Sequence, residues 1–109
     1  MLPSPNRLPK EVIADIMRYG ARATCDELTL YYKNNSTAPR FAFVVSTKID
    51  KRATSRNRIR RILSESVRHM LTRIAPIDGL ITVRKNIATL SQTGAEAMVT
   101  SLLLKAHLI

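Results

Sequence analysis

The chain has 109 residues, of which 45% are hydrophobic, enough for one folded domain with its own core and too many for a globally disordered chain. Lys and Arg total 18 against 8 Asp and Glu, so the net charge is +10, an excess that favours a polyanionic partner. No apolar run approaches the roughly 20 residues that span a bilayer, so we expect no membrane segment, although an anionic membrane surface could attract the charge.

The chain start, residues 1–8, is marked by prolines and is expected to be irregular; it lacks the basic-then-apolar layout of a secretory signal peptide. A single cysteine, Cys25, excludes an internal disulfide framework. Both features predict a reducing, cytoplasmic setting. From Pro9 to Tyr19 apolar residues recur at helical spacing and Gly20 is a suitable stop, so a short first helix is expected there.

Two strands are expected next. Residues 22–33 alternate weakly between apolar and polar positions, which is typical of a half-buried strand. Residues 41–45 are almost continuously apolar, which predicts a strand buried on both faces. Because successive strand residues point to opposite faces, Tyr31 and Tyr32 should face different sides of the sheet.

A long helix is expected after a basic segment, with Thr54 or Ser55 as its cap and an end near Ile74. A strand over residues 79–83 and a last helix over residues 94–106 complete the order helix, strand, strand, helix, strand, helix. The apolar positions that would form the buried stripe of the long helix are Ile59, Ile62, Leu63, Val67, Met70, Leu71 and Ile74.

The basic segment, residues 48–61, holds seven basic residues and one acid, and so carries +6 of the net charge. At about 100° per residue, the helix face opposite the buried stripe carries Asn57, Arg61, Ser64 and Arg68. A helix N-terminus favours phosphate, and arginine matches phosphate oxygens with a planar fork. Because clustered like charge opposes the helix dipole, a nucleic-acid partner explains the cluster better than a solvated charged face does.

Catalytic constellations are not recognisable in the sequence. The acids form no pair or metal motif, His69 and His107 are best interpreted as structural, and three glycines make no phosphate-binding loop. We therefore expect no active site formed by protein side chains, no protein-bound metal and no organic cofactor.

The motif Arg56-Asn57-Arg58-Ile59-Arg60-Arg61, preceded by Phe43-Val-Val-Ser46-Thr-Lys48, resembles the signature of the bacterial ribonuclease P protein subunit family. In that family a strand ending in Ser-x-Lys is followed by a short loop and by a long helix that opens with Arg-Asn-Arg. The resemblance extends across most of the chain, through Asn6-Arg7-Leu8, Leu28-Thr-Leu-Tyr31 and Asp78-Gly-Leu-Ile-Thr-Val-Arg84.

The resemblance implies an α/β fold, an α+β two-layer sandwich in one domain over residues 1–109, with a mixed sheet packed against helices in the order α-β-β(-β)-α-β-α. It also implies a left-handed βαβ crossover, an exception to the usual right-handed rule. Members of the family are the small subunit of a ribonucleoprotein that removes 5′ leaders from precursor tRNA. In the family, the RNA subunit cleaves the precursor tRNA, and it binds most of the Mg²⁺ ions that this reaction needs. Ribonuclease P RNA and the precursor-tRNA leader are thus the expected partners, with no small-molecule substrate.

Carried over residue by residue, the resemblance implies two binding surfaces. Contacts with the catalytic RNA would be made by Lys48, Lys51, Arg52, Arg56, Asn57, Arg58, Arg60, Arg61 and Arg68. A leader-binding cleft between the sheet and the first helix would be lined by Ile13, Met17, Tyr31, Ser46 and Arg84. Ile13 and Met17 stand where the family often has phenylalanines, so they can pack against a base but cannot stack as a ring does.

Two rival functions are also compatible with parts of the sequence. A structural RNA-binding protein, such as a ribosomal protein of similar fold, would share the basic helix but would not stimulate cleavage by ribonuclease P RNA. A protein-only nuclease would need an acidic cluster, which the sequence does not show.

Overall fold

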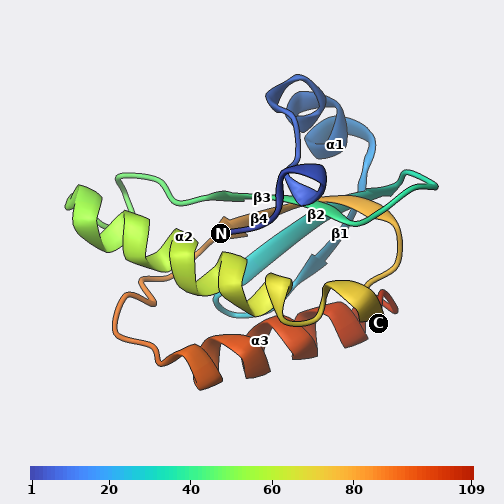
Figure 1. The fold of residues 1–109 in the computed structure, drawn as a ribbon. Helices are drawn as coiled ribbons and strands as arrows, with labels where there is room; N and C mark the ends of the chain where they lie inside the picture. The colour runs from blue at the N-terminus through green and yellow to red at the C-terminus, as the bar shows by residue number, and fades with distance from the viewer.

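A four-stranded sheet forms the middle of the molecule, and helices lie on both of its faces (Figure 1). The computed structural model describes all residues, 1–109. The strands are β1 (Ala21–Thr24), β2 (Leu28–Asn34), β3 (Arg40–Val44) and β4 (Ile77–Val83), in the spatial order β1-β2-β4-β3. The pairs β1–β2 and β2–β4 are antiparallel and β3–β4 is parallel, so the sheet is mixed.

Helix α1 (Ile13–Tyr19) lies on one face of the sheet, and α2 (Ala53–Arg68) and α3 (Gln92–Lys105) pack side by side on the other (Figure 1). Short 3-10 turns occupy Ser4–Asn6, Lys10–Val12 and Leu71–Arg73. The predicted α+β sandwich and its element order, with the optional third strand, are confirmed. Helix α2 connects the parallel neighbours β3 and β4, as a βαβ unit requires; the hand of that crossover stays a prediction. None of the helices has the length and apolar character needed to cross a membrane.

The two sheet faces bury cores of unequal size. Tyr32 packs against a cluster of 20 buried apolar residues that includes the inner sides of α2 and α3. Its neighbour Tyr31 packs against a cluster of three, Leu8, Ile16 and Leu80, to which α1 contributes. The prediction that the two tyrosines face opposite sides is confirmed, and the unequal cores leave much of the α1 face of the sheet uncovered.

Two strand predictions are wrong in detail. Residues 22–33 form a hairpin, because a turn closed by a hydrogen bond from Cys25 N to Leu28 O, 2.9 Å long, separates β1 from β2. The segment 41–45 is not buried on both faces: Val44 is 43% exposed, because like Ala42 it points to the sheet face that α1 covers only in part. The strand buried on both faces is β4, which lies between β2 and β3.

The long helix is shorter than predicted, and the predicted cap is wrong. It begins at Ala53, no side chain caps its first turn, and neither Thr54 nor Ser55 has that role. It ends at Arg68; the chain then continues through a 3-10 turn to Ile74, which is buried. The first backbone N–H groups of α2 are therefore left without side-chain partners.

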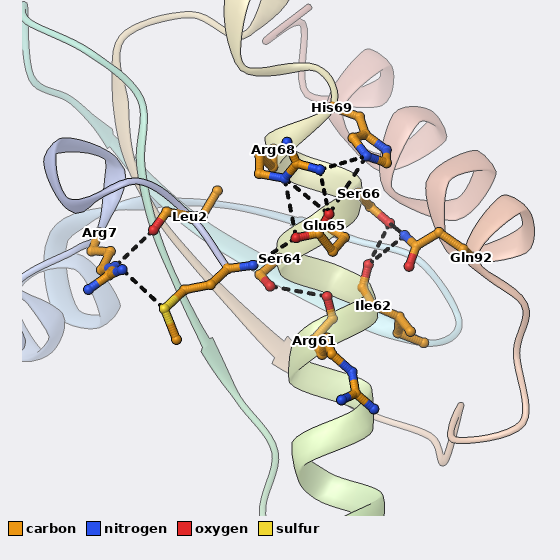
Figure 2. Close-up of polar contacts among 11 residues, drawn as sticks. Leu2, Arg7, Arg61, Ile62, Ser64, Glu65, Ser66, Arg68, His69 and Gln92 are labelled. Atoms are coloured by element: carbon orange, nitrogen blue, oxygen red, sulfur yellow. Dashed lines mark hydrogen bonds and ion pairs between the residues drawn. The ribbon is translucent and has the colours of Figure 1, made fainter.

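The chain start packs onto α2 (Figure 2). Leu2 is 3% exposed and belongs to the large core, and Arg7 Nε donates a hydrogen bond of 2.8 Å to Leu2 O. The amino group of Met1 lies 2.7 Å from Glu65 Oε1. The predicted exposure of Ser64 is wrong: this residue is 8% exposed, because it lies beneath this segment.

Candidate nucleic-acid interface

The loop before α2 is fixed by an acid. Asp50 Oδ1 accepts a hydrogen bond of 2.9 Å from Arg52 N, and the Asp50 carboxylate pairs with the Arg52 guanidinium at 3.1 Å. Asn86 Nδ2 donates to Asp50 Oδ2 at 3.0 Å and ties this loop to the connection between β4 and α3. The Arg52 guanidinium and backbone N–H, with Asn86, hold the pKa of Asp50 well below its usual range. Arg52 is thus one predicted RNA contact whose charge an acid already offsets.

Two arginines of the signature motif bind the protein's own backbone. Arg58 Nε donates to Ala88 O at 2.6 Å and Arg58 Nη2 donates to Leu90 O at 3.1 Å, which fastens α2 to the β4–α3 connection. Arg56 Nη1 donates to two carbonyls of the preceding loop, at 3.1 and 2.8 Å. Each guanidinium has other N–H groups that can donate to a further partner, but these backbone carbonyls fix the orientation of the guanidinium.

Three predicted RNA contacts have cationic side chains with no polar partner in the protein, whereas Arg56, Arg58 and Arg60 pair with no acid but donate to carbonyl or amide oxygens. Lys48, Lys51 and Arg61 are exposed and take part in none of the ion pairs of the protein. The Arg61 guanidinium projects from α2 without a polar partner (Figure 2). Asn57 is exposed one turn earlier, and its Oδ1 accepts a hydrogen bond of 2.5 Å from Arg60 Nη2. The predicted exposure of Asn57 and Arg61 is confirmed. We call Lys48, Lys51 and Arg61 the free cations.

At the far end of α2 the charges are paired (Figure 2). Arg68 Nε donates to both carboxylate oxygens of Glu65, and Arg68 Nη2 donates to Oε2 at 2.7 Å. Hydrogen bonds from Arg68 and from the N-terminal amino group lower the pKa of Glu65 to about 2. His69 lies in contact with Glu65 and with Glu96 of α3. Arg68 is exposed as predicted, yet its charge is already offset.

The predicted leader-binding residues fall in two groups. Ile13 and Tyr31 pack together against the small core, and Met17 is 49% exposed on α1. Ser46 follows β3 and Arg84 follows β4, and because these strands run parallel the two residues lie at the same end of the sheet. Both are exposed, and Arg84 Nη1 donates to a carbonyl of the β1–β2 turn at 3.0 Å.

A further cation, on the sheet face of Tyr31, is missed by sequence reasoning. Arg22 of β1 is the direct cross-strand neighbour of Tyr31, so the two side chains share a sheet face, and Arg22 is exposed. The signal that could have found it is the β1–β2 hairpin, which places Arg22 beside Tyr31 only once residues 22–33 are divided into two strands.

Three of the acids, Asp50, Glu65 and Asp78, are each paired with an arginine. Asp78 is bound bidentately by Arg40, at 2.7 Å to each oxygen, and also accepts from Asn35 Nδ2 at 2.8 Å. Burial raises the pKa of Asp78, but the hydrogen bonds from Arg40 and Asn35 outweigh burial and lower it overall. No group of three or more His, Cys, Asp or Glu side chains is placed to hold a metal ion.

These features define a small α+β domain with uncompensated cations around the start of one helix and an open, cation-edged sheet face on the other side. The chain belongs to the ribonuclease P protein family, since the family described as Ribonuclease P matches residues 2–107. It is 42% identical over 69 residues to the ribonuclease P protein component of Xanthomonas campestris pv. campestris (strain B100), which is 62% of this chain and 47% of that protein. It is 33% identical over 84 residues to that of Xylella fastidiosa (strain Temecula1), 77% of this chain and 62% of that protein. The aligned part thus spans about half the length of the first relative.

Solved structures show the same fold. The Staphylococcus aureus RNase P protein superposes with a TM-score of 0.84 at 20% identity, over 94% of this chain and 96% of that chain. The Thermotoga maritima RNase P protein gives a TM-score of 0.72 at 22% identity, over 92% of this chain and 93% of that chain. This likeness extends over nearly the whole α+β domain, including the four-stranded sheet and its helices.

Proposed function

We propose that this protein is the protein subunit of a cytoplasmic ribonuclease P ribonucleoprotein. It binds the catalytic RNA and the 5′ leader of precursor tRNA, and assists the endonucleolytic removal of that leader. Family membership supports the subunit role. The observation that carries RNA binding is the uncompensated charge of Lys48 and Lys51 in the loop before α2 and of Arg61 in its third turn. In this proposal the RNA subunit holds the Mg²⁺ ions and carries out the cleavage, and no protein side chain acts on the scissile bond.

Binding of the catalytic RNA is electrostatic and positional. The free cations neutralise phosphates and release counterions, and the uncapped first turn of α2 offers further N–H donors to a phosphate. Arg58 sets the position of α2 against the β4–α3 connection. If about six phosphates are neutralised, log affinity should fall with log salt concentration with a slope of about −4 to −5. A slope near zero in a filter-binding titration would contradict an electrostatic mode of RNA binding.

The leader lies on the other sheet face in this proposal. Tyr31 and Met17 contact bases beside α1, while Arg22 and Arg84 face the phosphates of an extended strand. The two RNA segments are thereby held on opposite sides of one sheet, so the protein can align the leader relative to the catalytic RNA without contributing chemistry.

The test is reconstitution with a bacterial ribonuclease P RNA at low Mg²⁺, with precursor-tRNA cleavage as the readout. The wild-type protein should stimulate cleavage, and Arg61→Gln should require a higher protein concentration for the same rate. Arg73→Gln is the matched control, because Arg73 is an exposed arginine beyond the far end of α2. Binding of the RNA without stimulation of cleavage would instead indicate a structural RNA-binding protein. Cleavage of precursor tRNA by the protein alone would indicate a protein-only nuclease.

The two-surface arrangement has its own test. Tyr31→Ala should raise the KM for precursor tRNA with a long leader, and should leave the affinity for the catalytic RNA unchanged. A substrate with a one-nucleotide leader is the control, since it cannot reach across the sheet. If Tyr31→Ala and Arg61→Gln have identical effects on both substrates, the division into two surfaces is wrong.

A further inference from the structure

A cavity lies between β3, the first half of α2 and the chain start. Its volume is about 440 Å³, within the range of small-ligand sites. The strand contributes Phe41 and Phe43 to its lining, and the helix contributes Asn57, Arg60, Arg61 and Ser64. None of the residues proposed for the leader surface lines it.

The strand side of the cavity is aromatic. Phe41 is 2% exposed, whereas Phe43 is only partly buried. The two rings are stacked, with centroids 6.4 Å apart and 14° between the planes. Phe43 therefore offers a ring that a second, fixed ring supports. Aromatic rings of this kind provide the stacking surface for unpaired nucleobases in many RNA-binding proteins.

The helix side is cationic and carries an amide. Asn57 Oδ1 accepts from Arg60, which leaves the Asn57 amino group as a donor at the cavity. Arg61 is unpaired, and no acid lines the cavity. A ring, an amide and two guanidiniums together match a base with its flanking phosphates, and the positive charge disfavours a cationic occupant.

The occupant would belong to the RNA on α2 and not to the leader. Phe43 packs toward the large core, on the sheet face of α2 and α3, while its neighbour Ala42 packs toward α1. The cavity thus opens beside the free cation Arg61, on the opposite sheet face from Tyr31.

We infer that this cavity receives one unpaired base of the catalytic RNA bound along α2. The base stacks at Phe43, Asn57 donates to its edge, and Arg60 and Arg61 hold the adjoining phosphates. This inference rests on the proposed function and adds a base-binding site to what would otherwise be phosphate contacts alone.

The main test fills the cavity without removing a ring or a charge. Ser64→Met places a larger apolar side chain into the lining, and should lower affinity for a bacterial ribonuclease P RNA about tenfold, the order expected for one lost base stack. The salt slope should stay unchanged, because the phosphate contacts remain. Ser101→Met is the matched control: Ser101 is an exposed serine of α3 that lines the protein's other cavity. Melting temperatures of both variants identify any effect of misfolding.

A second variant and a small probe complete the experiment. Phe43→Leu keeps an apolar side chain but removes the ring, and should reproduce the tenfold loss at constant slope. In NMR titrations, adenosine 5′-monophosphate should shift the Phe43 ring and Asn57 amide signals, whereas ribose 5-phosphate, which lacks the base, should not.

The outcomes separate the two levels of the proposal. If wild-type protein binds the RNA with a steep salt dependence but folded Ser64→Met and Phe43→Leu bind equally well, the base site is refuted and the proposed function stands. If the wild-type protein does not bind the RNA, the proposed function fails and the base site fails with it.

Discussion

The first part of α2 holds four arginines and its last turn holds one, and the two parts differ in how that positive charge is compensated. Around the first turns, Lys48, Lys51 and Arg61 have no acid partner. In the last turn Arg68 is bound by Glu65 through both of its carboxylate oxygens. An isolated helix would favour the opposite arrangement, because its N-terminal end already carries partial positive charge. The first end is therefore left with uncompensated positive charge, and the last end is already electrostatically satisfied.

Within the first turns, the motif arginines themselves differ. Arg58 is oriented by two backbone carbonyls of a distant loop, whereas Arg61 projects from the helix without a partner. Arg58 thus stabilises the packing of α2 against the β4–α3 connection, whereas the Arg61 guanidinium is free to bind another molecule. Replacing Arg58 with alanine should mainly lower the stability of the fold, and replacing Arg61 with alanine should mainly lower the affinity for RNA.

The largest effect is expected for Arg58→Ala. Loss of two hydrogen bonds from a charged donor should cost about 2 kcal/mol of unfolding free energy and lower the Tm by roughly 10 °C. The salt slope of RNA binding should hardly change. Thermal unfolding followed by circular dichroism checks this, with Arg58→Lys as an intermediate control that cannot reach both carbonyls in one plane. An unchanged Tm with a slope reduced by about 1 would show that Arg58 contacts phosphate.

Arg61→Ala should have the next largest effect, on binding and not on stability. Removing one phosphate contact should lower affinity about tenfold and reduce the salt slope by about 1. Its Tm should stay the same or rise, because like-charge repulsion along α2 decreases. Filter binding over a series of salt concentrations is the measurement. An affinity loss with an unchanged slope would contradict a phosphate contact.

Glu65→Gln should strengthen RNA binding slightly. The change releases Arg68 from its carboxylate partner, so the second end of α2 comes to resemble the first. An increase in affinity of about two- to threefold is expected, since exposed ion pairs are weak. The double variant Glu65→Gln with Arg68→Ala is the control and should lose the gain. If Glu65→Gln weakens binding, the acid contributes to the interface in a way that its pairing does not explain.

The smallest expected effect is the acid dependence of this same pair. Hydrogen bonds from Arg68 and the N-terminal amino group lower the pKa of Glu65 from 4.5 to about 2. A lowered folded-state pKa means that the pair stabilises the fold above pH 4.5 and loses this contribution as the pH falls toward 2. Denaturant unfolding of wild type and Glu65→Gln should therefore differ most near neutral pH and converge near pH 2. A difference that persists at pH 2 would mean that the charge of Glu65 is not its cause.

Local patterns predicted the helices well and the strands less well. The apolar stripe along α2 appears at the predicted spacing because helix periodicity is a local property. Residues 22–33 are divided by Cys-Asp-Glu, a turn without the glycine or proline that usually marks one. The apolar run at 41–45 could not reveal that β3 lies at the sheet edge, because strand order is set by pairing between distant segments.

The sequence by itself determined the excess of positive charge, its concentration in residues 48–61, and its position at the start of a long amphipathic helix. Only the tertiary structure decided which of those cations the fold itself uses. Arg58 finds its acceptors thirty residues away, and Arg61 finds none. The tertiary structure also formed the cavity that lies between β3, α2 and the chain start. Composition and periodicity record what each segment carries, whereas the anchoring of Arg58 and the formation of the cavity depend on contacts between segments far apart in the chain.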